Sequence, residues 1–208
     1  TLEVPLDESL FTLSDTSLVD PDGYPEASGI CYSRGKMYVA VQRLDTTNWH
    51  TPVGESFVIV FDAASCALIA QISLPFVNPT IGPRVEKSTG EILVNCVGGY
   101  GVNDGGIVKI DTSADDVHSV VLTETDAGGD IYGYAYYDND TAYALTNAGW
   151  GQPYVLRSFN PATGGVDATV VHQTAAYGAP VAVIGGKLIF GEVAAGDEGL
   201  IFFDASTG

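Results

Sequence analysis

The chain has 208 residues, of which 46% are hydrophobic and only 16% charged, so it can bury a substantial core and disorder is not expected. Its 26 acidic and 8 basic residues give a formal charge of −18, which argues against nucleic acid or an anionic membrane surface as a partner. No apolar run approaches the length of about 18 residues that a membrane-spanning helix needs.

The first 23 residues precede the repeating part of the chain. They are acidic and lack the basic and apolar regions of a signal peptide, so we expect either a cytosolic protein or one whose signal has been removed. Within them, the alternating run Ser9–Leu13 is predicted to form a strand that belongs to none of the repeats that follow.

From residue 24 onward, the chain repeats one pattern four times, with a period in the forties. In each repeat a hydrophobic run ends in Asp or Asn and a small polar turn follows. Two further hydrophobic runs precede this turn, and one more follows it in three of the repeats. In chain order the predicted strands are 27–32, 37–42, 57–62 and 68–74; 81–86, 92–97, 107–111 and 119–123; 132–137, 142–147, 155–160 and 167–172; and 179–184, 188–193 and 200–204.

A period in the forties built from four strands is typical of a β-propeller blade. The sequence therefore predicts an all-β protein: one propeller domain over residues 1–208, made of about four four-stranded antiparallel blades. After a lead-in at 1–23, the predicted blades are 24–75, 76–125, 126–174 and 175–208. No segment has a helical period of useful length.

The last repeat reaches Gly208 directly after its turn and is one strand short. We expect the N-terminal strand 9–13 to complete this last blade, because an open edge of backbone donors and acceptors is rarely left bare. The strand can come from the same chain, which its high effective concentration favours, or from a neighbouring chain, which would build a fibre. A third alternative is that the 208 residues are part of a longer ring.

Three stretches carry a family resemblance: Lys36-Met-Tyr-Val-Ala-Val-Gln42, Asn95-Cys-Val-Gly-Gly-Tyr-Gly101 and Phe159-Asn-Pro-Ala-Thr-Gly164. They resemble the YVTN-type surface propellers of bacteria and archaea, although the literal YVTN tetrapeptide is absent. The resemblance implies a propeller fold and an extracellular, cell-surface or periplasmic location. It implies no catalytic residues, because that family has no common set.

Acidic residues occur in the loops that join the second strand of a repeat to the third, and also where the first strands begin. In a propeller these segments share one face, where carboxylates could bind a hard cation such as calcium. The alternative is that they are ordinary turn formers. The candidate metal ligands are Glu26, Asp104, Asp130, Asp197 and Glu198.

Aromatic residues lie in the same loops. Exposed Trp and Tyr side chains often mark a recognition surface, so we expect a protein or carbohydrate ligand there. They could equally be wedged between blades. The candidate ligand-binding residues are Trp49, Tyr100, Trp150 and Tyr154.

The sequence contains no recognisable catalytic set. Its three histidines lie in different repeats, there is no Gly-x-Ser-x-Gly motif, and the three cysteines lack zinc-site spacing. The cysteines are either all thiols or form one internal disulfide, which is the most that an odd count permits. We therefore predict a non-catalytic extracellular or cell-surface binding or assembly module. The alternatives are a self-assembling fibre subunit and a hydrolase or oxidoreductase with its site at the ring mouth.

Overall fold

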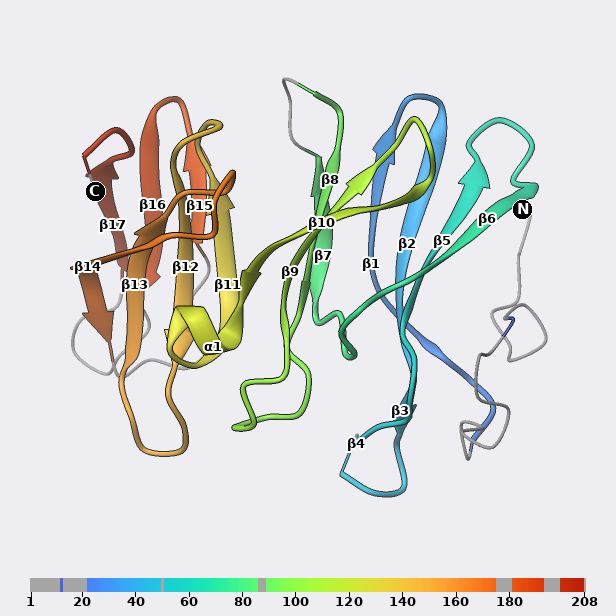
Figure 1. Ribbon diagram of the computed structural model, residues 1–208, viewed down its shortest axis with the longest axis horizontal. Helices are drawn as coiled ribbons and strands as arrows, with labels where there is room; N and C mark the ends of the chain where they lie inside the picture. Colours follow the sequence, from blue (N-terminus) through green and yellow to red (C-terminus); the bar gives the residue numbers. More distant parts are fainter. Residues whose placement is uncertain are drawn as a thin grey trace. The chain divides into compact units, whose positions relative to one another are not determined.

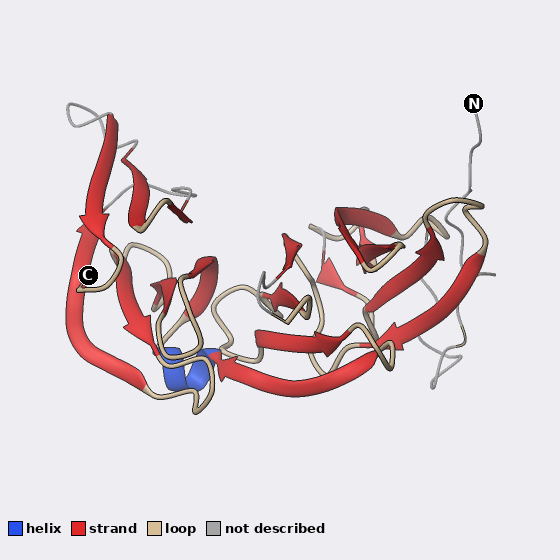
Figure 2. Ribbon diagram, turned by 90° about the horizontal axis from the view of Figure 1, so that it is seen from above, coloured by secondary structure: helices blue, strands red, loops and turns tan. Residues whose placement is uncertain are grey.

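The computed structural model describes residues 12, 22–49, 51–85, 89–174, 181–192 and 199–207. The fold is a β-propeller in which each antiparallel sheet of three or four strands is one blade (Figure 1). Strands dominate the described residues, with one four-residue helix among them (Figure 2). The chain divides into two compact units, Thr1–Gly99 with Ile107–Val120 and Tyr100–Gly106 with Val121–Gly208.

The first unit holds the first two sheets. In the first sheet the strands lie in the order β1-β2-β5-β6, and in the second in the order β10-β9-β8-β7. A small ribbon, β3 paired with β4, lies in the connection from β2 to β5. The strand bounds are β1 (Glu26–Ser33), β2 (Lys36–Gln42), β3 (Leu44–Asp45), β4 (Thr51–Pro52), β5 (Phe57–Asp62), β6 (Leu68–Ser73), β7 (Ile81–Val85), β8 (Ile92–Cys96), β9 (Gly106–Asp111) and β10 (Asp116–Thr123).

The second unit holds the third and fourth sheets, and the short helix α1 precedes them. The third sheet has the order β11-β12-β13-β14 and the fourth the order β15-β16-β17. The bounds are α1 (Glu124–Ala127), β11 (Asp130–Tyr136), β12 (Ala142–Asn147), β13 (Tyr154–Phe159), β14 (Val166–Thr174), β15 (Val181–Ile184), β16 (Lys187–Glu192) and β17 (Gly199–Asp204).

Each unit has a core between its two sheets. Strands β8 and β12 are buried along their whole length. In the first unit alternate side chains of β2 and β5, including Tyr38 and Val60, pack with Val94 and Val108 of the second sheet. The corresponding core of the second unit contains residues of β12, β13 and β16.

The repeated Asp or Asn has a structural role that explains its recurrence. In the first turn one oxygen of Asp62 accepts hydrogen bonds from the Ser65 amide at 2.7 Å and the Ser65 hydroxyl at 2.7 Å. Asp111 and Asp204 each accept a hydrogen bond from the hydroxyl of the serine two positions later. Asn160 accepts hydrogen bonds from backbone amides of its own turn. The hydrogen bonds that Asp204 accepts lower its pKa to about 2, and the bond from the Ser206 hydroxyl is the largest cause. The motif therefore closes hairpins.

The predicted fold class is confirmed, and each predicted strand within the described residues matches an observed one to within a few residues. The last sheet contains three described strands, with β17 at its outer edge. Most of the predicted closing strand 9–13 lies outside the described residues. Its one described residue is Thr12, whose amide donates to Gln71 Oε1 at 2.8 Å, on β6 of the first sheet.

The three cysteines are free thiols, the first of the two alternatives that the sequence left open. Cys96 is buried, and burial raises the pKa of Cys31 to about 12, so neither is a reactive thiolate. Within the described residues, no helix has the length and apolar character that crossing a bilayer requires.

Candidate functional site

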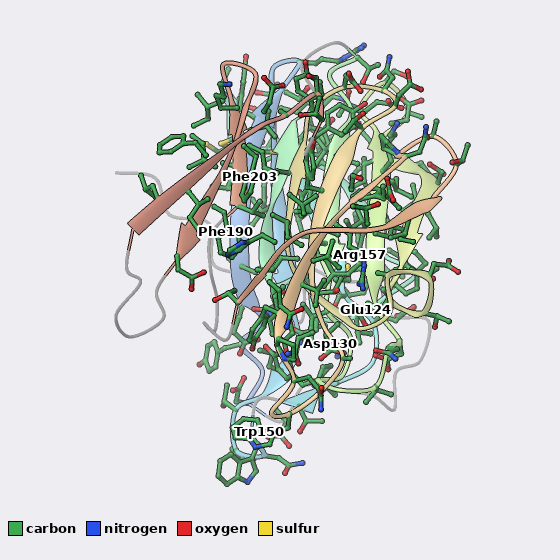
Figure 3. All side chains as sticks on the ribbon, turned by 90° about the vertical axis from the view of Figure 1, so that its left-hand side faces the viewer. Glu124, Asp130, Trp150, Arg157, Phe190 and Phe203 are labelled. Atoms are coloured by element: carbon green, nitrogen blue, oxygen red, sulfur yellow. The ribbon has the colours of Figure 1, made fainter. Side chains whose placement is uncertain are left out.

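A cavity of about 940 Å³ opens among the loops at one end of the third sheet. Its walls come from residues 100–101 of the β8–β9 loop, the start of β11, the end of β12 with the β12–β13 loop, and the end of β14, all of which belong to the second unit. Figure 3 labels two of its residues, Asp130 and Trp150. The lining residues are Tyr100, Gly101, Asp130, Tyr132, Asn147, Gly149, Trp150, Gly151, Gln152, Pro153, Tyr154 and Gln173.

Three tyrosines form a continuous aromatic cluster in this cavity. The rings of Tyr100 and Tyr132 are stacked, with centroids 6.3 Å apart and planes at 21°. Tyr132 also meets Tyr154 edge to face, with a centroid distance of 5.3 Å. Trp150 adds a fully exposed indole at the tip of the β12–β13 loop. The cluster therefore offers aromatic surface in two orientations.

The β12–β13 loop is held in place by Asn147. Its Oδ1 accepts from the Gly149 amide at 3.0 Å, and its Nδ2 donates to the Gln152 carbonyl at 2.7 Å. Gly151 has φ of 77°, a left-handed conformation that glycine adopts without strain. Because both ends of the Asn147 amide bind the loop backbone, the loop is a rigid turn that displays Trp150 outward.

The β8–β9 loop, which supplies Tyr100, is anchored by the buried Glu124. Glu124 Oε2 accepts from the Gly105 amide at 2.8 Å and Oε1 from the Ile131 amide at 2.9 Å. Burial raises the pKa of Glu124 to about 7 against the effect of these two donors, and the nearby Asp130 and Asp104 charges add to the rise. Glu124 is completely buried, so its role is to join the loop to β11 rather than to meet a ligand.

Asp130 lies on the cavity floor and is 2% exposed. Its Oδ2 accepts hydrogen bonds from the Gly101 amide at 2.6 Å and from the Tyr132 hydroxyl at 3.3 Å. Its Oδ1 is buried and has no hydrogen-bond partner. Both partners of Asp130 are donors, so the group acts as an acceptor in this site.

The structure brings together three of the four predicted ligand-binding residues: Tyr100, Trp150 and Tyr154 all line the cavity. Trp49 is 94% exposed and lies in the first unit, between β3 and β4. The important residue outside the predicted set is Tyr132, which joins the other two tyrosines. Its signal was its place beside Asp130, near the start of the first strand of its repeat.

Of the predicted metal ligands, Asp104 and Asp130 belong to the second unit, with Asp104 exposed and Asp130 on the cavity floor. Glu26 belongs to the first unit and accepts from the Leu44 amide at 3.1 Å. Asp197 and Glu198 lie outside the described residues. Among the described residues, no three His, Cys, Asp or Glu side chains are grouped so as to hold a metal ion. The calcium site stays a prediction.

Comparison with solved structures places this chain among propellers. It is similar to the Dos1 propeller, at 12% identity over 90% of this chain with a TM-score of 0.52. It is also similar to a variant of Synechocystis apocarotenoid oxygenase, at 10% identity over 88% of this chain with a TM-score of 0.50. The chain spans 58% of the first protein and 48% of the second. At these identities the likeness shows the fold alone.

No protein-family model matches the chain, and no curated protein matches it.

Proposed function

We propose that the protein is a non-catalytic binding module that holds a carbohydrate or protein ligand at the cavity on the third sheet. The observation that carries this proposal is the aromatic cluster of Tyr100, Tyr132 and Tyr154, with the fully exposed Trp150 beside it. A concave site lined by aromatic rings and a few fixed polar groups is the usual form of a small-ligand pocket. The fixed loops reduce the entropy lost on binding.

The polar residues of the cavity support binding more than hydrolysis. Asp130 is the sole carboxylate among the described lining residues, and no histidine, cysteine, lysine or arginine is among them. Glycoside hydrolysis ordinarily uses two carboxylates that face one bond. Glu124, which lies close to Asp130, is fully buried and bonded to two backbone amides. An acid in that position does not reach a substrate.

We further propose an extracellular, cell-surface or periplasmic location. The strongly acidic composition and the resemblance to YVTN-type surface propellers support it. The same location would suit a module that presents an open aromatic site to polysaccharide or protein.

The test compares two exposed tryptophans on equivalent loops. Oligosaccharides from bacterial and plant polysaccharides and a peptide library are titrated by isothermal calorimetry against the parent protein, Trp150→Ala and Trp49→Ala. We expect a ligand whose affinity falls at least about tenfold in Trp150→Ala, the size of effect typical of an aromatic anchor, and is unchanged in Trp49→Ala. Equal losses in both variants, or catalytic turnover of a bound oligosaccharide, would contradict the proposal.

A further inference from the structure

The cavity holds a negative charge that the described protein does not neutralise. Asp130 has backbone and tyrosine donors on Oδ2 but no partner on Oδ1, and no basic residue is among the described residues that line the cavity. Burying a carboxylate away from water is costly unless a charge partner or enough donors offset the loss. The Asp130 carboxylate therefore lacks a hydrogen-bond donor on one oxygen and a positive charge to neutralise it.

Three donor groups of the cavity are already used elsewhere or on the other oxygen of Asp130. The Asn147 amide group donates to the Gln152 and Pro153 carbonyls, so its donors are used within the loop. The Gly101 amide and the Tyr132 hydroxyl already donate to Asp130. A ligand that supplies both a donor and a positive charge would complete the site.

The aromatic surfaces favour the same kind of ligand. The faces of Tyr and Trp rings carry negative potential and attract cations. Tyr100 is 56% exposed and Trp150 is fully exposed, so both present ring surface to an incoming group. The charge of −18 on the whole chain further raises the local concentration of cations near the surface.

We propose that the ligand held in this cavity carries an alkylammonium group, which lies against the rings of Tyr100, Tyr132 and Trp150 within reach of the Asp130 charge. This inference rests on the proposed binding function and names the chemistry that the site selects. Such a group occurs in lysine side chains and, as a primary amine, in amino sugars, which supply the donor as well as the charge. The quaternary groups of choline and trimethyl-lysine supply the charge alone.

The experiment separates charge from shape. Choline and its uncharged isostere 3,3-dimethylbutan-1-ol are titrated at constant ionic strength against the whole protein, with trimethyl-lysine amide and glucosamine as further arms. We expect choline to bind at least about tenfold more tightly than the isostere, a difference of about 1.4 kcal/mol. The ranking of the charged arms shows which source of the group fits best.

Matched variants locate the effect. Asp130→Asn removes the buried charge with little change in shape and should reduce choline affinity about tenfold while leaving isostere affinity within about twofold. Asp104→Asn removes the same charge from an exposed position of the β8–β9 loop that is not among the lining residues, and should change neither. Tyr100→Leu, which keeps an apolar side chain at an exposed position, should weaken choline binding even if Asp130→Asn proves unstable.

The outcomes distinguish the two proposals. Equal affinity for choline and its isostere, or equal effects of Asp130→Asn and Asp104→Asn, overturns the alkylammonium inference and leaves the binding module intact. If none of these probes binds but an uncharged oligosaccharide does, and its binding requires Trp150, the inference again fails and the proposed function stands. If no ligand of any class depends on Trp150 or Tyr100, both fail.

Discussion

The Oε2 atom of Glu124 accepts a hydrogen bond from the Gly105 amide at 2.8 Å, and so joins a fully buried side chain to the loop that carries Tyr100. Oε1 of the same carboxylate accepts from the Ile131 amide, one residue after Asp130. One acid therefore sets the position of two walls of the cavity. Its raised pKa, near 7, makes that support dependent on pH.

The free energy of unfolding should fall as the pH rises from about 4.5 to about 7, through the contribution of Glu124. Its pKa is higher in the folded protein, about 7, than the ordinary value of 4.5, mainly because burial penalises the charged form. The folded state thus holds the proton more tightly, and stability is fully present below the lower value and lost as the pH passes the higher one.

Glu124→Gln isolates this effect from the other carboxylates. The variant cannot ionise, and its amide leaves one of the two backbone donors unsatisfied, at a cost of about 1 to 3 kcal/mol. We expect its deficit relative to the parent protein to shrink as the pH rises from 4.5 to 7, measured by urea unfolding at several pH values. Parallel pH profiles for the two proteins would contradict the assignment.

Gly129→Ala should be severely destabilising. A Cβ atom at this position would lie 2.4 Å from the Asn147 carbonyl oxygen, a backbone atom that cannot move without displacing the β12–β13 loop. We expect a loss of about 3 kcal/mol or more, because overpacking against a backbone atom is not relieved by a rotamer change. The control is Gly128→Ala, whose added Cβ atom meets no atom within 4 Å. Its φ of 80° is unfavourable for alanine, so we expect a loss of about 1 kcal/mol in the free energy of unfolding. Thermal unfolding that ranks the two variants equally would contradict this explanation.

Arg43 should stabilise the first unit through backbone contacts. It is 1% exposed, and its Nη1 donates to the Val53 carbonyl at 2.9 Å and to the Glu55 carbonyl at 3.4 Å, which holds the segment between β2 and β5. Arg43→Met keeps an apolar stem but removes these donors. We therefore expect the free energy of unfolding to fall by about 1 to 3 kcal/mol.

The matched control is Arg34→Met, because Arg34 is exposed and donates to the Thr89 carbonyl at 2.7 Å. Water can replace that donor, so we expect a loss below about 0.5 kcal/mol. Denaturant titration of both variants checks the difference. A similar loss in the two would show that burial of Arg43 is not what makes its contacts matter.

Tyr143 should link the third and fourth sheets through one buried hydrogen bond. Its hydroxyl donates to the Ala205 carbonyl at 2.8 Å, beyond the end of β17. Tyr143→Phe should cost about 1 kcal/mol, while Tyr136→Phe, which removes an exposed bond to Asn139, should cost much less. Hydrogen exchange should show faster opening of β17 in Tyr143→Phe alone; unchanged exchange there would contradict the link.

The sequence by itself determined the strands, the hairpin turns and the number of blade repeats. These features are local, because hydrophobic alternation and an Asp or Asn followed by a small polar residue act within a few positions of the chain. The turn at Asp62, with its bonds to Ser65, needs nothing distant to form. Of the four aromatic residues predicted to lie in loops, Trp49, Tyr100 and Trp150 do so, whereas Tyr154 is the buried first residue of β13.

Only the tertiary structure decided which of those loops meet. Tyr100 follows the second strand of one sheet, whereas Tyr132 and Tyr154 belong to the next, and their contact depends on how the β8–β9 loop is anchored by Glu124. Trp49 occupies the same place in its repeat as Trp150 but lies in the other unit, and a local pattern cannot distinguish the two. The unpartnered oxygen of Asp130 likewise appears only when distant segments surround it, because burial and the supply of donors are properties of packed neighbours and not of the residue type.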